Sequence, residues 1–296
     1  MRSPSRLVAG LSGLLCVVLV SAIARGQGYK VRISQPEKVG NKFSISSTAT
    51  EKMSSSVALP GVPPQEMAYT LDLDGTVEVL AVNDKTAQPT KLSCTVAKCT
   101  RDGEKVYDAG AIITADSTGG HPVITVNGNE ADAHTTEQLT SILQTHKPGD
   151  SETDDKMFGT DQPQKVGNSW PVNSEAVAKA FSEQGDGLPI SKDDVSGTVK
   201  LVSVQKVEGK EYLEVVADLD VKNIHGQSNG ANIESGSMTG HMTALLPADE
   251  GARPLDDSMS MKMKMTAKAP GPNGQDLTVS MNVQRDVKTK ISEAGK

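Results

Sequence analysis

Aromatic residues are scarce in this sequence, whose 296 residues include three Phe, four Tyr and one Trp. A hydrophobic core must therefore be built from Val, Leu, Ile, Ala and Met. Hydrophobic residues make up 36% of the chain, below the roughly 45–50% of an average soluble domain. Alternating patterns and many β-branched residues nevertheless favour a folded β protein with a large surface over a disordered chain.

Cysteine and clustered positive charge are also scarce. Three cysteines, one of them at position 16, cannot make a disulfide framework. The net charge is −7 and no basic run occurs, whereas duplex-binding proteins neutralise phosphates with clustered Lys and Arg. The composition therefore excludes electrostatic binding to nucleic acid.

The first 24 residues have the pattern of a signal peptide. Arg2 and Arg6 precede an apolar stretch from Leu7 to Val20, and small residues follow it. The stretch is shorter than the ~20 residues of a comfortable bilayer span. We expect cleavage between Ala24 and Arg25, a secreted or periplasmic location, and no stable membrane span after cleavage.

Export predicts an oxidising environment, in which Cys94 and Cys99 could form a disulfide. In an extended strand five residues span about 17 Å, whereas a disulfide needs Cα atoms within ~7 Å. A bridge would therefore require a bulge or turn between the two residues. Without a bridge, we expect one core thiol and one more exposed thiol.

A nine-residue segment occurs twice, at residues 35–43 and 162–170, with six identical positions. In both copies Gly-Asn supplies a tight turn, and an aromatic residue anchors the element that follows. The repeat predicts two duplicated β-rich lobes, residues 25–156 and 157–296, or else two lobes that merely reuse one turn. The turn and anchor residues are Gly40, Phe43, Gly167 and Trp170.

Apolar and polar residues alternate over residues 67–73, 213–221 and 277–283, as expected for strands with one buried face. Gly75 is expected to turn the chain after the first of these strands, and Glu208-Gly209 to form a hairpin turn. The pattern predicts a mainly β fold, an antiparallel curved sheet or half-barrel.

Helical spacing is limited to two short segments. Asp132 is expected to cap one helix, which ends before Pro148. Asn173 or Ser174 is expected to begin the other, with Val177 buried on it together with Phe181.

The segment Leu71–Thr76 (LDLDGT) resembles the nucleophile motif of the haloacid dehalogenase-like phosphatases, in which the first Asp attacks phosphorus. The acidic run around Asp150 would supply the magnesium motif. That family needs helical crossovers between parallel strands, whereas residues 76–125 have the pattern of successive strands. We therefore favour Asp72 and Asp74 as solvated carboxylates on a hairpin strand.

Methionine is concentrated near the C-terminus, where seven of the 11 residues fall between positions 238 and 281. Alternation places the four between residues 259 and 265 on one face of a strand, and neighbouring strands would join the others to them. The candidate ligand-binding residues are Met238, Met242, Met259, Met261, Met263, Met265 and Met281.

Three interpretations of these methionines compete. They could be a core layer that replaces the missing aromatics, an adaptable groove for a lipid-like or peptide ligand, or a Cu(I) site. A strand separates residues i and i+2 by about 6.5–7 Å, which counts against a compact copper site.

Catalytic signals are absent from the sequence. The five His have no metal-ligand spacing, and no nucleophile elbow, phosphate loop or Cys-x-x-Cys occurs. We therefore expect a protein that is not an enzyme, with no catalytic residues, no metal site and no cofactor.

The exported start, the alternating strands and the turn Lys165–Trp170 (KVGNSW) resemble a group of uncharacterised exported bacterial β-rich proteins. In that group a Val-Gly-Asp-x-Trp-like turn opens the second half, and Asn168 here replaces the commoner Asp. A weaker, architectural analogy is with lipoprotein-carrier-like half-barrels, whose curved sheet holds acyl chains. The group has no established activity, so the resemblance assigns no functional residue.

These observations predict an exported, non-enzymatic binding or envelope-associated protein. Its most concrete role would be to carry a hydrophobic, lipid-like ligand. The main alternative is a structural or interaction protein, for example with an envelope partner, whose methionines are ordinary core.

Overall fold

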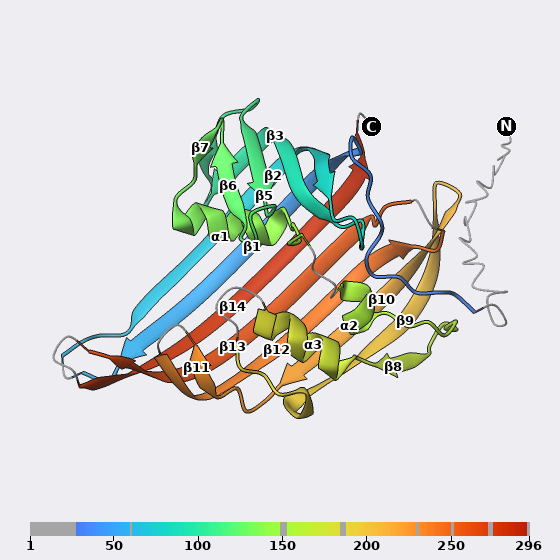
Figure 1. Cartoon of the computed structure of the whole chain (residues 1–296). Coiled ribbons are helices and arrows are strands. Elements are labelled where there is room, and N and C mark those ends of the chain that lie inside the picture. Colours follow the sequence, from blue (N-terminus) through green and yellow to red (C-terminus); the bar gives the residue numbers. More distant parts are fainter. Residues whose placement is uncertain are drawn as a thin grey trace, which may run out of the picture.

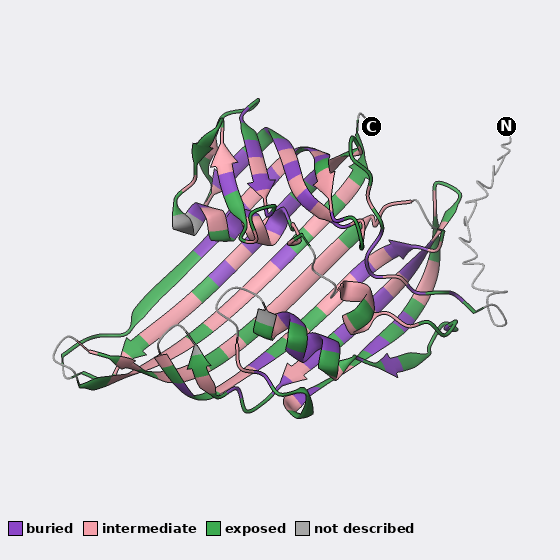
Figure 2. Cartoon of the chain, viewed as in Figure 1, coloured by how far each residue is buried: buried purple, intermediate pink, exposed green. Residues whose placement is uncertain are grey.

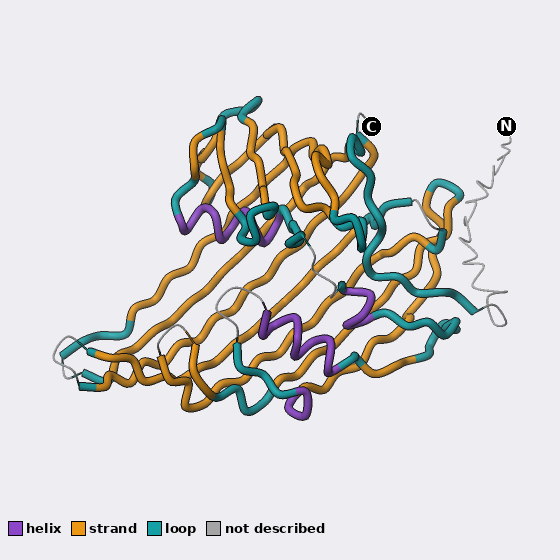
Figure 3. Tube along the Cα trace, viewed as in Figure 1, coloured by secondary structure: helices purple, strands orange, loops and turns teal. Residues whose placement is uncertain are grey.

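The structure is a computed structural model that describes residues 28–59, 61–148, 153–183, 188–228, 231–249, 252–271 and 275–294. The predicted signal peptide, including Ala24 and Arg25, lies outside the described residues, as does Asp150. Strands make up most of the described chain (Figure 3). The helical elements are α1 (Ala133–Ile142), α2 (Asp154–Phe158), α3 (Ser174–Glu183) and the 3-10 turn η1 (Lys192–Asp194).

The strands range from two to 18 residues in length. They are β1 (Lys42–Val57), β2 (Gln65–Val82), β3 (Pro89–Arg101), β4 (Glu104–Tyr107), β5 (Ile112–Asp116), β6 (Val123–Val126), β7 (Asn129–Glu130), β8 (Ser169–Pro171), β9 (Val195–Val207), β10 (Lys210–Val221), β11 (Gly226–Ser228), β12 (Ala231–Pro247), β13 (Asp256–Pro270) and β14 (Asp276–Glu293).

All described strands belong to one open antiparallel sheet, in the order β7-β6-β5-β3-β2-β1-β14-β13-β12-β10-β9-β8, with β4 paired to β3 and β11 paired to β12 off this path. Figure 1 shows that the sheet is curved and that α1 lies toward one end of it while α2 and α3 lie toward the other. The first and last long strands, β1 and β14, pair in the middle of the sheet. The predicted mainly β, curved antiparallel fold is confirmed.

The alternation in β2 does bury one face, but the expected turn at Gly75 is wrong. Leu71, Leu73 and Val77 are buried, and β2 runs on through Gly75 to Val82. A Cβ at Gly75 would lie 2.6 Å from the Cys94 Sγ atom on β3. Glycine is therefore required here by a close strand approach and not by a turn.

The two cysteines are both free and both buried, with exposed fractions of 0% for Cys94 and 1% for Cys99. The expectation of one more exposed thiol was wrong because β3 has a bulge: Asp74 pairs with Lys98 and Gly75 pairs with Val96, which leaves Ala97 extra. The extra residue returns Cys99 to the buried face. Burial raises the pKa of Cys94 to about 12 and that of Cys99 to about 11.

Both predicted helices are confirmed. The Asp132 carboxylate accepts from the Thr135 backbone N–H at 2.9 Å and caps α1. The Asn173 side chain accepts from Ala176 N–H at 3.1 Å at the start of α3, which buries Val177 completely. The short helix α2 was not predicted, because five residues are too few for a periodic pattern.

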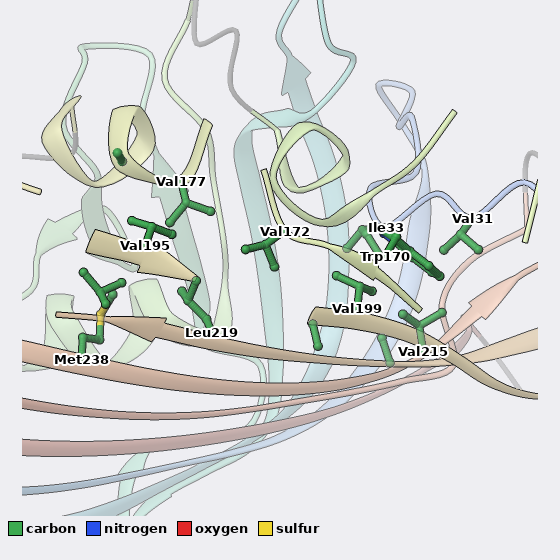
Figure 4. Packing of buried hydrophobic residues seen from close by; sticks show 14 of the residues in the cluster. Val31, Ile33, Trp170, Val172, Val177, Val195, Val199, Val215, Leu219 and Met238 are labelled. Carbon is green, nitrogen blue, oxygen red and sulfur yellow. The ribbon is translucent and has the colours of Figure 1, made fainter. Parts of the chain in front are cut away.

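Buried side chains form two hydrophobic clusters, one toward each end of the sheet (Figure 2). In the first, Val177 of α3 lies above Leu219 and Met238, and Trp170 lies near Val199 (Figure 4). In the second, residues of α1 such as Leu139 pack on β1 to β6 and on Val287 of β14. Residues 29–33 of the N-terminal half pack in the first cluster, with strands of the C-terminal half.

The two copies of the repeated segment form the same turn. Gly40 and Gly167 have positive φ values of 85° and 90°. The Gly40 N–H donates to Val79 O and the Gly167 N–H to Leu201 O, both at 2.8 Å. The backbone N–H groups of the next residues, Asn41 and Asn168, donate to the carbonyl oxygens of Lys38 and Lys165. The carbonyl oxygens of Asn41 and Asn168 accept from the N–H groups of Val79 and Leu201, respectively. Whether the lobes 25–156 and 157–296 arose by duplication stays a prediction.

Candidate functional site

The sheet brings the seven candidate methionines onto one face. Residues paired across antiparallel strands point to the same side, and the pairs include Met238 with Met263, Met242 with Met259, and Met265 with Met281. This is the side on which α1 and α3 pack, because Met238 belongs to the α3 cluster and Val287, the partner of Met259, to the α1 cluster.

Two further methionines extend this face. Met53 on β1 pairs with both Val283 on β14 and Met67 on β2. Neither was predicted from the sequence, because they lie roughly 200 residues before β13 and only the β1–β14 pairing brings them close. We define the methionine face as Met53, Met67, Met238, Met242, Met259, Met261, Met263, Met265 and Met281.

Burial divides the methionine face into a covered edge and an open middle. Met238 is only 2% exposed and is part of the core beneath α3. The other predicted members are half-buried, and Met67 on β2 is 48% exposed. Met238 therefore has the packing of an ordinary core residue, while the rest leave thioether surface partly open to solvent.

One ion pair interrupts the apolar middle. Arg285 of β14 donates from Nε and Nη2 to Glu51 Oε2 on β1, at 2.8 and 2.5 Å. Arg285 Nη2 also donates to Glu137 of α1 at 2.5 Å, which ties the helix to the sheet. In the same row of the sheet, burial and the Glu51 carboxylate raise the pKa of Tyr69 well above its usual value. Sequence patterning missed this pair because neither residue has a motif around it.

A cavity of about 210 Å³ lies at the junction of the two clusters, beside Met242. Its apolar wall includes Ile142 and Leu143 of α1 and Ala244 and Leu246 of β12. We call it the junction cavity. Its polar lining residues are Ser34, Gln35, Glu37, Gln88, Gln144, His146, Asp154, Arg253, Asp257 and Thr289.

Three polar atoms of this lining have no hydrogen-bond partner among the described residues. They are Ser34 Oγ, Gln35 Oε1 and Asp257 Oδ1, and each is buried. Burial, with the nearby carboxylates Asp154 and Asp256, raises the pKa of Asp257 to about 6. Buried polar atoms are paired in the large majority of cases, so three unpaired atoms among the residues that line one cavity are unusual.

The predicted aromatic anchors have different roles. Phe43 lines the junction cavity, and the Arg253 guanidinium lies 4.0 Å from its ring centroid. Arg253 in turn donates to both carboxylate oxygens of Glu37, each at 2.6 Å, so the first copy of the turn closes one side of the cavity. Trp170 is instead a core residue, and its Nε1–H donates to Phe158 O at 2.8 Å and fixes the end of α2.

The phosphatase hypothesis finds no structural context in the described residues. Asp72 lies on a strand flanked by antiparallel neighbours, and it accepts from the hydroxyls of Thr48 and Thr100. The chain passes from β2 to β3 by a short turn and not by a helical crossover. Within the described chain, no group of three or more His, Cys, Asp or Glu is placed to hold a metal ion.

No family model and no curated protein matches this chain. Among solved structures, a lipovitellin structure titled for its lipid–protein interactions has a TM-score of 0.33 and 11% identity over 88% of this chain, which spans only 26% of the lipovitellin chain. A LolA superfamily protein from Nitrosomonas europaea has a TM-score of 0.16 and 8% identity, with 84% of this chain and 86% of that protein covered. These are weak structural neighbours, and TM-scores under 0.5 establish neither a shared fold nor a shared ligand.

The helices of the structure are short. In the part of the chain that is described, none is long and apolar enough to cross a membrane.

Proposed function

We propose that this protein is an exported, non-enzymatic binding protein that carries a hydrophobic, lipid-like ligand on its methionine face. The observation that supports the proposal is a band of half-buried methionines on the face where α1 and α3 pack. Its members are Met261, Met263 and Met265. Thioether side chains are unbranched and polarisable, and they adapt to ligands of irregular shape. An apolar strip that is open to solvent lowers the solubility of a protein, and a bound ligand would cover it.

The opposite face of β13 is polar, so the two faces of this strand differ in character. Lys262 and Lys264 are exposed, while their neighbours Met261 and Met263 are half-buried on the helix side. The alternation thus separates a wetted surface from a candidate binding surface, with the sheet between them.

The test is a fluorescence titration with phenylnaphthylamine, a neutral apolar probe. The double variant Met261→Gln/Met263→Gln should lower probe affinity by about tenfold or more, because burying a Met side chain contributes roughly 1.5–3 kcal/mol. The matched control Lys262→Gln/Lys264→Gln changes the other face of the same strand and should bind as the parent does. Circular dichroism checks that both variants are folded.

Two results would overturn the proposal. If the parent chain does not bind the probe at saturating concentrations, the methionines act as ordinary core and the protein fits the structural or interaction role better. If the methionine and lysine variants lose affinity equally, the probe binds elsewhere.

A Cu(I) site is the second candidate, favoured by one observation. The pairing of Met242 with Met259 and of Met265 with Met281 places sulfur-bearing side chains directly opposite each other. Paired Cβ atoms in antiparallel strands lie about 4.5–5.5 Å apart, closer than neighbours along one strand. Cu(I) should then raise the melting temperature, and the double variant Met259→Leu/Met265→Leu, which breaks both pairs, should remove the shift. An unchanged melting curve with added Cu(I) would rule the site out.

Export is the remaining part of the proposal. Native mass spectrometry of protein purified from its own compartment should give the mass of a chain that begins at Arg25. The same spectrum would reveal a retained lipid as an additional mass. A chain that keeps residues 1–24 would contradict cleavage.

A further inference from the structure

We propose that the junction cavity is a head-group subsite that binds a primary ammonium group, so that the carried ligand is a cationic amphiphile. The inference rests on the proposed ligand-carrying function and names the chemistry of the ligand's polar end. Asp257 is the residue that would hold the ammonium group, and Ser34 and Gln35 would complete its hydrogen bonds.

Strand β13 aligns the two parts of such a ligand. Asp257, Met259, Met261, Met263 and Met265 occupy alternate positions with an unbroken register to β14, so all five lie on one face. Asp257 lines the junction cavity, and the methionines continue from it along the strand. From Asp257 to Met263 the strand rises about 20 Å, the scale of a long alkyl tail.

The cavity and the methionine face are adjacent. Met242 belongs to both, since it lines the cavity and pairs with Met259. The volume of about 210 Å³ is below the roughly 300–1,000 Å³ of sites for whole drug-sized ligands. The cavity therefore has room for a head group and a few carbons, while the tail would continue over the methionines.

The unpaired atoms decide the type of head group. Gln35 Oε1 and Asp257 Oδ1 are acceptors, and the Ser34 hydroxyl can also accept. Ser34 and Gln35 are each only 9% exposed, so bulk water does not replace the missing partners. A primary ammonium carries three N–H donors, as many as these residues have unpaired atoms that can accept.

The charges of the cavity lining also favour a cationic head group. The lining contains the carboxylates of Glu37, Asp154 and Asp257. The guanidinium of Arg253 already makes a two-point contact with Glu37. A carboxylate or phosphate head group would meet Asp257 without a compensating cation, and like charges in a partly buried site repel strongly.

The experiment compares three ligands with one twelve-carbon tail, namely dodecylamine, dodecanol and dodecanoate. Each displaces phenylnaphthylamine from the parent chain at neutral pH and at monomeric ligand concentrations. Dodecylamine should displace the probe at about tenfold lower concentration than dodecanoate, with dodecanol between them.

Variants then locate the effect. Asp257→Asn should abolish the preference for the amine, and Ser34→Ala should weaken it several-fold through a second, independent contact. Asp256→Asn is the matched control, because Asp256 is exposed on the opposite face of the same strand, and it should keep the full preference.

The outcomes separate this inference from the function on which it rests. If the neutral probe does not bind, both fail. If the probe binds and the three ligands displace it equally, the methionine face stands and the ammonium subsite is overturned. A preference that survives in both Asp257→Asn and Ser34→Ala would likewise overturn it.

Discussion

Arg285 of β14 and Glu51 of β1 form an ion pair in the middle of the apolar sheet face, with Arg285 Nε 2.8 Å from Glu51 Oε2. Their side chains are 21% and 10% exposed, so the charges are largely removed from water. The pair also crosses the β1–β14 pairing, where the first and last long strands join the two halves of the sheet. The pair therefore links the two halves of the sheet at that pairing.

Removing one partner of the pair should destabilise the protein more than removing both. Arg285→Leu leaves the Glu51 carboxylate buried without its cation and should cost about 3 kcal/mol of unfolding free energy. The double variant Arg285→Leu/Glu51→Leu should cost about 1 kcal/mol, because no charge remains buried. Urea unfolding measures both. Glu137→Gln is the control: this partner of Arg285 is 54% exposed and should cost under about 1 kcal/mol. A double variant whose loss equals the sum of the losses of Arg285→Leu and Glu51→Leu would contradict the coupling.

Asp257 should make stability depend on pH. Its folded pKa of about 6 lies above the usual value of 3.8, so the folded state binds this proton more tightly than the unfolded state. The group therefore stabilises the fold below about pH 4, and stability falls as pH rises toward 6 and above. Asp257→Asn removes this loss and should be more stable than the parent at pH 7.5, by up to about 3 kcal/mol.

Melting temperatures at pH 4 and pH 7.5 check this expectation. The difference between Asp257→Asn and the parent should be small at pH 4 and large at pH 7.5. Asp256→Asn, on the exposed side of the strand, removes only the last of the three causes of the raised Asp257 pKa and should show a much smaller change of the same sign. A variant that is no more stable than the parent at pH 7.5 would show that the carboxylate has a partner in solution.

The two repeated turns should be equally sensitive to a side chain. Gly40 and Gly167 have positive φ values, and an added Cβ would meet nothing within 4 Å at either site. The cost of Gly→Ala is then conformational alone, about 1 kcal/mol at each position and additive in the double variant. Gly119→Ala is the control, since it also faces open space but has no positive φ. Chemical denaturation would contradict the equivalence if one turn tolerated Ala and the other did not.

The thiols of Cys94 and Cys99 should be inert in the native state. Both are buried, and burial raises their pKa values to about 12 and about 11, so almost no thiolate is present near pH 8. In a chain without residues 1–24, a thiol reagent should react with neither until urea unfolds the protein, and then with both. Fast labelling of the native protein, or a mass lower by two hydrogens, would contradict free buried thiols.

Local pattern was enough to predict strands over residues 67–73, 213–221, 259–265 and 277–283, the buried face of the first two, and two helices, but it did not predict β1. Alternation identifies the face of a residue because the side-chain period of a strand is two, and Asp132 and Asn173 are capping residues whose effect extends over three residues. The same local logic failed at Gly75 and Cys99. A glycine required by a neighbouring strand looks like a turn glycine, and the bulge at Ala97 has no signal in its own sequence.

The sequence by itself determined that Met259, Met261, Met263 and Met265 share one face of a strand, because parity is a property of the strand alone. Only the tertiary structure decided which strands adjoin that face. The pairing of β1 with β14 adds Met53 and places Glu51 beside Arg285, and the junction of the two clusters brings Ser34 near Asp257. Pairing between distant strands depends on how the whole sheet packs and curves, which no local pattern encodes.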